Sequence, residues 1–163
     1  MTDLTLIAAT GAALPARPFE GRHLIDGVWQ PGASGETFER RSPAHGVVVS
    51  RSALGAPEDA ETAIRAARSA FDRGIWSRIS GKARATVLLK VADLIEANVE
   101  RIALLETLES GKPITQARGE VSGAADLWRF AASLARTLHG DSHNTLGEDM
   151  LGVVLKEPIG VVS

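Results

Sequence analysis

The chain ends in an apolar run with the character of a buried strand, and this run most constrains the fold. After Pro158 the sequence reads Ile-Gly-Val-Val-Ser to its last residue, with no turn signal. A β-branched run of this kind is typical of a strand that is covered on both faces. Domains more often close on polar residues, because an unpaired apolar strand end has no partner to bury it. We therefore expect residues 158–163 to be the truncated start of a buried strand in a larger protein.

Composition and charge limit the classes of partner. The 163 residues are 44% hydrophobic, and 18 basic residues against 20 acidic ones give a formal net charge of -2. Without a cationic surplus, neither nucleic acid nor an anionic membrane is an expected partner. No apolar run approaches the length that spans a membrane. The absence of cysteine excludes disulfides, thiolate metal sites and a cysteine nucleophile within this stretch.

The first residues match neither of the two common targeting signals. The apolar stretch Leu4 to Leu14 is preceded by Asp3, and the first cation is Arg17. A secretory signal needs positive charge before its apolar core, and a mitochondrial presequence needs an Arg-rich, acid-poor face. A cytoplasmic protein is therefore expected.

The first third of the sequence predicts short extended segments. In residues 1–21, Gly11, Pro15 and Pro18 break any regular period, which indicates a mobile N-terminal arm without a packed element. Residues 23–29 predict a hairpin, because Asp26-Gly27 supplies the positive φ angles of a tight primed turn. A second pair of extended runs is expected at 37–41 and 47–52, joined by a turn at 43–46.

Two helical regions follow. The first is predicted to begin at Pro57, with acids in its first turn, and to end at Gly74. The second carries an apolar stripe between Val87 and Leu105, with charged residues mostly off the stripe. Asn98 leaves open whether this stretch is one helix or two in succession.

A third helix and a further strand complete the pattern. Gly111-Lys112-Pro113 ends the second helical region, since Gly fits a helix C-terminus and Pro cannot continue the helix. The third helix carries apolar residues from Val121 to Leu138 and is expected to end at Gly140. Residues 150–156 again have strand character. Each helix is apolar on one face only, so the pattern predicts an α/β protein whose main sheet is implied but not supplied here.

No motif in the chain makes a convincing active site. His139 and His143 are four residues apart, a spacing that suits a metal on a helix, but Gly140 falls where the helix should end, which favours a solvated loop. Ser110 to Pro113 is similar to the end of a phosphate-binding loop, yet it lacks the upstream glycine and the hydroxyl after Lys112, and a helix stop is the better interpretation. The remaining glycine pairs match no dinucleotide fingerprint after a strand: Gly32 and Gly35, and Gly119 and Gly123.

Five phrases, taken in order, resemble the N-terminal part of the aldehyde dehydrogenase superfamily. Their order and spacing cover nearly everything after Gly21. The phrases are LIDGVW at 24–29, SPAHGVV at 42–48, AIRAARSAF at 63–71 with Trp76, LLETLESGKP at 104–113 and KEPIGVV at 156–162. Residues 71–77 and 103–114 are also similar to the branch that acts on aminoaldehydes such as γ-glutamyl-aminobutyraldehyde.

The resemblance implies a subunit with a dinucleotide-binding domain, a catalytic domain and an oligomerisation arm. On this reading, residues 22–140 form the N-terminal part of the dinucleotide-binding domain, with hairpins and helices flanking a Rossmann-like sheet. Residues 141–157 form the oligomerisation β-arm, through which a homo-oligomer would assemble, and 158–163 begin the first cofactor-domain strand. Some family members also bind a monovalent cation near the start of the third helix, where Glu120 aligns with a position that is usually Asp.

The resemblance also implies a reaction. Family members oxidise an aldehyde to a carboxylic acid with NAD or NADP, through a cysteine thiolate, oxyanion-stabilising donors and a glutamate-activated water. In the family pattern those residues all fall after Ser163, so the resemblance assigns no catalytic, cofactor-binding or metal residue to this chain. The cofactor site is expected to lie mostly outside it, and the chain alone is expected to be inactive.

Three hypotheses remain at this point. In the first, the chain is part of an NAD(P)-dependent aldehyde dehydrogenase. In the second, it is a catalytically inactive remnant that acts as an assembly or regulatory partner. The third, an unrelated helical binding module, would leave the five phrases as coincidence. The first two predict that apolar helix faces stay uncovered in this chain, at Ile64, Phe71, Leu94 and Trp128.

Overall fold

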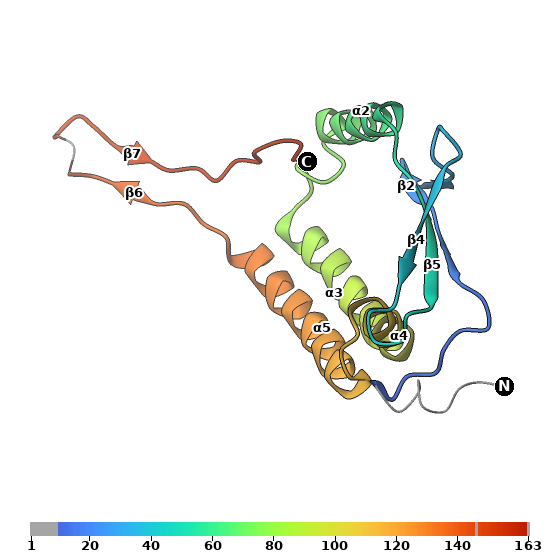
Figure 1. The fold of residues 1–163 in the computed structure, drawn as a ribbon. Coiled ribbons are helices and arrows are strands. Elements are labelled where there is room, and N and C mark those ends of the chain that lie inside the picture. The colour runs from blue at the N-terminus through green and yellow to red at the C-terminus, as the bar shows by residue number, and fades with distance from the viewer. Residues whose placement is uncertain (1–9, 146, 163) are drawn as a thin grey trace.

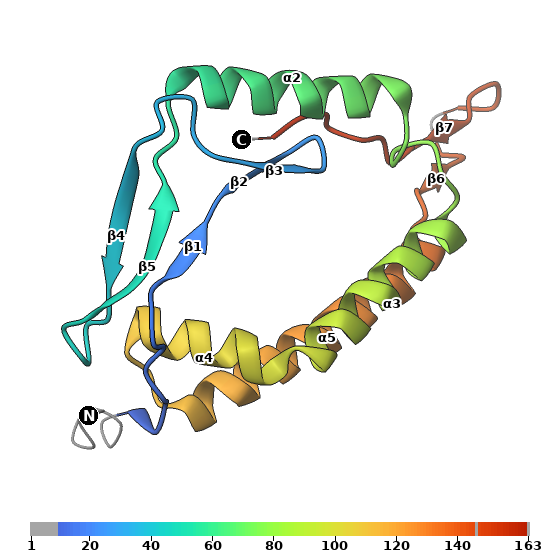
Figure 2. The ribbon, with the colours of Figure 1, turned by 90° about the vertical axis from the view of Figure 1, so that its right-hand side faces the viewer.

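The computed structural model describes residues 10–145 and 147–162. It is an α/β structure in which four long helices accompany three small sheets. Helix α2 lies apart from the packed helices α3, α4 and α5, and a thin β-arm projects from the far end of α5 (Figure 1). In Figure 2, α2 runs along one side and α3 with α5 along the other, with the larger sheet at one end.

The first hairpin forms as the sequence predicts. Strands β2 (His23–Ile25) and β3 (Val28–Gln30) pair antiparallel, with Leu24 opposite Trp29. Between them, Asp26 has φ 49° and Gly27 has φ 79°. Positive φ at both central residues is the mark of the tight primed turn, whose twist matches that of the flanking strands.

The larger sheet combines the second predicted pair of strands with a strand that the sequence did not predict. β4 (Thr37–Arg41) and β5 (Val48–Ala53) pair antiparallel, which confirms the prediction for 37–41 and 47–52. β1 (Phe19–Gly21) adds to the other edge of β5 in parallel, so the strand order is β1-β5-β4.

The expectation that residues 1–21 hold no packed element is wrong for residues 10–21. Phe19–Gly21 belong to the sheet, and Ala12 is only 2% exposed in the hydrophobic core. The reason is that both contacts are made with residues distant in sequence, which local periodicity does not report. Residues 1–9 lie outside the described residues.

The first helix has the predicted bounds. Helix α2 spans Pro57–Arg73 and ends at Gly74, whose φ of 70° is left-handed and whose N–H is donated to the carbonyl of Phe71. Proline at the first position and acids in the first turn suit a helix N-terminus. None of its residues is buried, so α2 offers its faces to solvent in this chain.

The second helical region is two helices, which settles the question that Asn98 left open. α3 spans Gly81–Ala97 and begins at Ser80, whose Oγ accepts from the backbone N–H of Ala83 at 3.2 Å. α4 spans Val99–Ser110, and Asn98 between them has φ -116° and ψ 18°. Its side-chain amide donates to the carbonyl of Leu94 at 2.8 Å, satisfying an acceptor at the end of α3.

Helix α5 (Ile114–Thr137) is the longest element and ends earlier than predicted. Its last helical residue is Thr137 and Leu138 is extended, whereas the sequence suggested an end at Gly140. The residues of α5 that are buried are small or β-branched: Ile114, Ala117, Val121, Ala125 and Ala132. Small side chains let the axis of α5 approach those of α3 and α4 closely.

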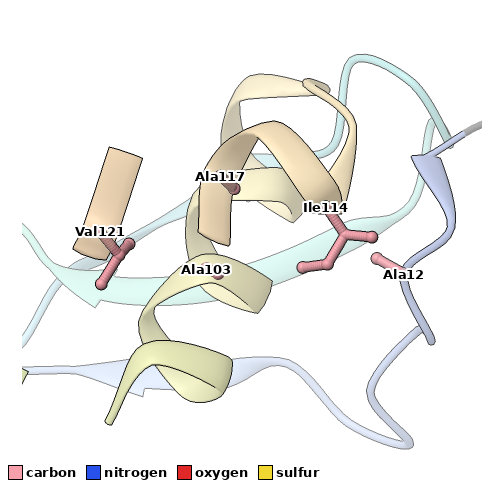
Figure 3. Packing of buried hydrophobic residues seen from close by; sticks show 5 residues of the cluster. All are labelled: Ala12, Ala103, Ile114, Ala117 and Val121. Atoms are coloured by element: carbon pink, nitrogen blue, oxygen red, sulfur yellow. The ribbon is translucent and has the colours of Figure 1, made fainter. Parts of the chain in front are cut away.

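The core lies where α4, α5 and the N-terminal segment meet. Ala103 of α4 and Ala117 of α5 are fully buried, and Ile114, Val121 and Ala12 close the cluster (Figure 3). Leu108 is the largest of the fully buried side chains among the described residues. This packing holds α4, α5 and the N-terminal segment together.

The strand predicted for 150–156 is much shorter in the structure. Only β7 (Gly152–Val153) forms, paired antiparallel with β6 (Ser142–His143). Residues 158–162 form no strand within the described part of the chain, so the strand expected there has no paired neighbour to define it. Strand geometry needs a hydrogen-bonding partner, and β-branched composition alone does not supply one.

Candidate functional site

A hollow lies between α2 and the C-terminal segment. It is open to solvent, has a volume of about 790 Å³ and is bounded by Phe71 of α2, by Trp76, by Leu138 at the end of α5 and by residues 156–158 and 160–162. The C-terminal segment runs below α2 in Figure 2. The side chains of Phe71, Trp76 and Leu138 are apolar, which suits packing against protein rather than binding of a charged group.

The one-sided helices leave apolar faces uncovered, as the sequence predicts. Ile64 on α2 is 52% exposed and Leu94 on α3 is 64% exposed. Trp128 on α5 is also exposed, and Phe71 is half-buried. Large exposed apolar patches mark surfaces that meet another partner or another part of a protein.

Lys112 is held in an ion cluster, which explains why the phosphate-loop reading does not apply. Its Nζ lies 2.8 Å from Oε1 of Glu106 and 2.5 Å from Oε2 of Glu120. The hydrogen bond to Glu106, and then the one to Glu120, raise the pKa of Lys112. Two carboxylates pair with this ammonium group, whereas the lysine of a phosphate-binding loop pairs with phosphate oxygens. Gly111, with φ 81°, ends α4 as predicted.

The same cluster answers whether Glu120 could hold a cation. Oε2 of Glu120 accepts a hydrogen bond from Nζ of Lys112, and Oε1 accepts one from Nε2 of Gln116 at 3.0 Å. The hydrogen bonds from Lys112 and then Gln116 lower the pKa of this carboxyl. Glu120 is therefore engaged by groups of the protein itself.

The histidine pair does not form a metal centre. His139 follows the end of α5, and its Nδ1 lies 2.9 Å from the carbonyl oxygen of Thr137. His143 lies in β6, so the two rings do not share a helix face. Across residues 10–145 and 147–162, no three His, Asp or Glu side chains gather as a metal site would require.

The glycine pairs do not build a dinucleotide cradle either. Gly119 and Gly123 lie inside α5, where their N–H groups serve the helix. Gly32 and Gly35 lie in the loop between β3 and β4, where the N–H of Gly35 donates to the carbonyl of Gly32 at 2.9 Å. A phosphate cradle needs free N–H groups at a helix N-terminus after a strand, and neither pair provides one.

Asp59 links the start of α2 to the loop between β3 and β4, a contact that the sequence did not predict. Its Oδ2 accepts from the N–H of Ala56 at 2.9 Å, which caps α2, and both carboxylate oxygens accept from the N–H of Ala33. The Ala56 and then the Ala33 hydrogen bonds lower the pKa of Asp59, with a smaller contribution from His23. The sequence marks Asp59 as a first-turn acid, but not as a link to the β3–β4 loop.

The β-arm carries exposed apolar residues in alternation. Leu151 is 70% exposed and Leu155 is 72% exposed, with Val153 of β7 between them. At the base of the arm, the N–H of Val154 donates to the carbonyl of Asp141 at 2.8 Å. A two-stranded ribbon with open edges and uncovered side chains is poorly stable alone.

Comparison with known proteins places these features in a family. The sequence profile described as the Aldehyde dehydrogenase family matches residues 29–163. The chain belongs to the aldehyde dehydrogenase family. This bears out the resemblance that the five phrases carried.

Two curated relatives and one solved structure illustrate the similarity. Aldehyde dehydrogenase 1 of Tanacetum cinerariifolium is 43% identical over 139 residues, covering 85% of this chain and 28% of that protein. The NADP/NAD-dependent aldehyde dehydrogenase PuuC of Escherichia coli (strain K12) is 39% identical over 145 residues, covering 88% and 29%. The crystal structure of an NAD-dependent aldehyde dehydrogenase from Sinorhizobium meliloti superposes with a TM-score of 0.79 at 48% identity, covering 84% and 28%.

The chain therefore spans less than a third of the length of these relatives. The matching structures agree with the predicted fold class, α/β. The hairpins and helices of this chain correspond to the N-terminal part of the family fold. Among the described helices, none is both long and apolar enough to cross a membrane.

Proposed function

We propose that this chain is part of an enzyme that oxidises an aldehyde to a carboxylic acid with NAD or NADP. The observation that carries the proposal is family membership across residues 29–163, with 39% to 43% identity to aldehyde dehydrogenases. Within the chain, the residues 10–145 and 147–162 act as scaffold. They supply helix faces and an arm, and the reacting groups belong elsewhere in the enzyme.

The cofactor is proposed to bind mainly outside the described segments. Neither glycine pair forms a phosphate cradle, and the ammonium group of Lys112 is taken by Glu106 and Glu120. The bound dinucleotide would accept hydride from the substrate, and this chain would contribute only the packing that holds its domain in place. Exposed Ile64 and Leu94 are the surfaces offered for that packing.

The test is the production of reduced nicotinamide cofactor by the intact protein. We expect cofactor reduction that depends on added aldehyde, with release of the matching carboxylic acid. An intact protein that binds the dinucleotide but oxidises no aldehyde would favour the inactive remnant with an assembly role. The exposed apolar faces support that second candidate equally well, so the assay separates the two.

We also propose that the substrate is an aminoaldehyde, because residues 71–77 and 103–114 are similar to the branch of the family that acts on aminoaldehydes. We expect kcat/KM for an ω-aminoaldehyde to exceed that for an unsubstituted aldehyde of equal length. Equal values for the two would remove this finer assignment and leave the general one standing. A cytoplasmic location belongs to the same proposal, and cell fractionation tests it.

The partner that we propose is a second copy of the same subunit, in a homo-oligomer. Residues 141–157 would pair with another subunit, because Leu151, Val153 and Leu155 are exposed and the ribbon edges are open. The double variant Leu151→Asp with Leu155→Asp should dissociate the oligomer in sedimentation velocity. The matched control, Met at both positions, keeps the apolar surface and should keep the oligomer. An Asp variant that sediments like the parent protein would contradict the proposal.

A further inference from the structure

The N-terminal strap, defined here as residues 10–21, crosses from the helices to the sheet. It begins beside the core of α4 and α5, where Ala12 is buried, and ends as strand β1 on the edge of β5. Figure 2 shows its course from near α4 to the sheet. Residues 13–18 between these two anchors have no regular secondary structure. A segment held at its ends with an irregular middle is suited to open as a local unit.

A buried polar network fastens the start of the strap. The Oγ1 of Thr10 lies 3.2 Å from Nε2 of His45, and the Oγ of Ser42 lies 2.8 Å from Nδ1 of the same ring. All three residues are less than a tenth exposed. A neutral imidazole has one donor and one acceptor nitrogen, and a hydroxyl can take either role, so both ring nitrogens are satisfied.

The turn that carries His45 is itself firmly placed. The N–H of Gly46 donates to the carbonyl of Ser42 at 2.8 Å, and the N–H of Ser42 donates to the carbonyl of Val47 at 2.9 Å. The turn also lies against the end of α4, since a Cβ built on Gly111 would be 3.0 Å from Cγ of Pro43. His45 therefore joins this turn to the start of the strap, whose other anchors are Ala12 in the core and β1 on the edge of β5.

The strap protects a strand edge. β5 has β4 on one side and β1 on the other, so within residues 10–145 and 147–162 it is β1 that covers its second edge. β5 includes the buried residues Val49 and Ala53, whereas β4 at the far edge is exposed throughout and carries Glu39, Arg40 and Arg41. The residues of β5 that β1 covers are Ser50, Arg51 and Ser52, so β1 protects the backbone N–H and C=O groups of that edge, which another strand could otherwise pair with.

We propose that Thr10, His45 and Ser42 form a latch that keeps the N-terminal strap closed over the edge of β5. Breaking the latch lets the strap, with β1, leave β5 while the α3–α5 helices stay folded. The latch thus controls a local opening reaction of the fold, separate from unfolding of the whole molecule.

The experiment compares Thr10→Val with Thr10→Ser in the intact protein. Valine keeps the size of the side chain but removes the hydroxyl, whereas serine keeps the hydroxyl. In hydrogen–deuterium exchange, the valine variant should exchange the amides of β1, and those amides of β5 that face β1, about tenfold faster, since it loses one buried hydrogen bond and leaves the ring nitrogen without a partner. The serine variant and the amides of α3 and α5 should match the parent protein. Unchanged exchange at β1, or equal acceleration in all elements, would overturn the latch.

A second measurement locks the strap covalently. Glu20 and Arg51 are paired across β1 and β5, and residues 1–163 contain no cysteine. Adjacent strands lie about 4.8 Å apart, within the range that a disulfide spans. Forming a disulfide from Glu20→Cys and Arg51→Cys in the Thr10→Val background should return β5 exchange to the parent rate, and reduction should release it again. Fast exchange at β5 with the disulfide closed would show that the opening is not movement of the strap.

Discussion

Asp59 on α2 accepts hydrogen bonds from the backbone N–H of Ala33, although 26 residues separate the two. The same carboxylate caps α2 through the N–H of Ala56. One side chain therefore fixes the start of α2 and the loop that follows the first hairpin. Its charge matters to both contacts, because a carboxylate accepts from N–H groups more strongly than a neutral acid does.

Replacing Asp59 by Asn should lower the stability of the protein at neutral pH and flatten its dependence on acid. The hydrogen bonds from Ala56 and Ala33 lower the pKa of Asp59, so its contribution is present above the unfolded-state pKa. That contribution is lost as the pH falls through the lower, folded-state pKa. Urea unfolding at several pH values should show parent and variant converging in acid. A constant gap between them at all pH values would contradict this account.

Ser50→Ala should loosen the contact between the sheet and α4. The Oγ of Ser50 on β5 donates to Oε1 of Glu109 at 2.6 Å. Removing this donor should cost about 1 kcal/mol, because Glu109 is exposed and water can replace part of the bond. Ser69→Ala, on the exposed surface of α2, serves as the control and should change the free energy of unfolding little. A Ser50 variant as stable as that control would rule out a role for this bond.

Two glycine-to-alanine changes should have opposite signs. Gly111 has φ 81° at the end of α4, and a Cβ there would crowd Pro43. Gly111→Ala should therefore destabilise the protein by about 1–2 kcal/mol, the cost of left-handed backbone for an L-residue. Gly119 lies in α5 with open space around its Cα, so Gly119→Ala should stabilise by up to about 1 kcal/mol. Thermal melts of the pair that shift in the same direction would contradict the backbone argument.

Leu108→Ala should be among the more damaging core changes. Leu108 is fully buried, and truncation removes contacts and leaves a cavity that costs about 2–5 kcal/mol. Leu155→Ala on the exposed arm removes the same atoms and should cost less than about 0.5 kcal/mol. The comparison is made by urea unfolding of the isolated chain, where the arm has no partner. Similar losses at both positions would mean that Leu108 is not part of a packed core.

The elements that could be predicted are those with local signals. Gly74 and Gly111 adopt left-handed backbone at the ends of α2 and α4, and Asp26-Gly27 makes the tight turn, because each needs only its own φ angles. The exposure of Ile64 and Leu94 was also predictable, since a helix that is apolar on one face needs a partner for that face.

The features that could not be predicted depend on contacts between distant residues. β1 exists because Phe19 lies opposite Ser50, and nothing near Phe19 in the sequence signals that pairing. The sequence predicts His45 only as a turn residue, and its contact with Thr10 is seen only in the structure. The ion cluster around Lys112 brings Glu106 of α4 and Glu120 of α5 to the same ammonium group, a contact that depends on how the two helices pack.

We propose that the described residues are scaffold and that the reacting groups lie elsewhere in the enzyme. The most direct test is aldehyde oxidation by the purified 163-residue polypeptide alone, followed as formation of reduced NAD or NADP. We predict no aldehyde-dependent signal above the protein-free rate, and no tight dinucleotide binding in calorimetry of the same sample. Sustained turnover by this polypeptide would contradict the account.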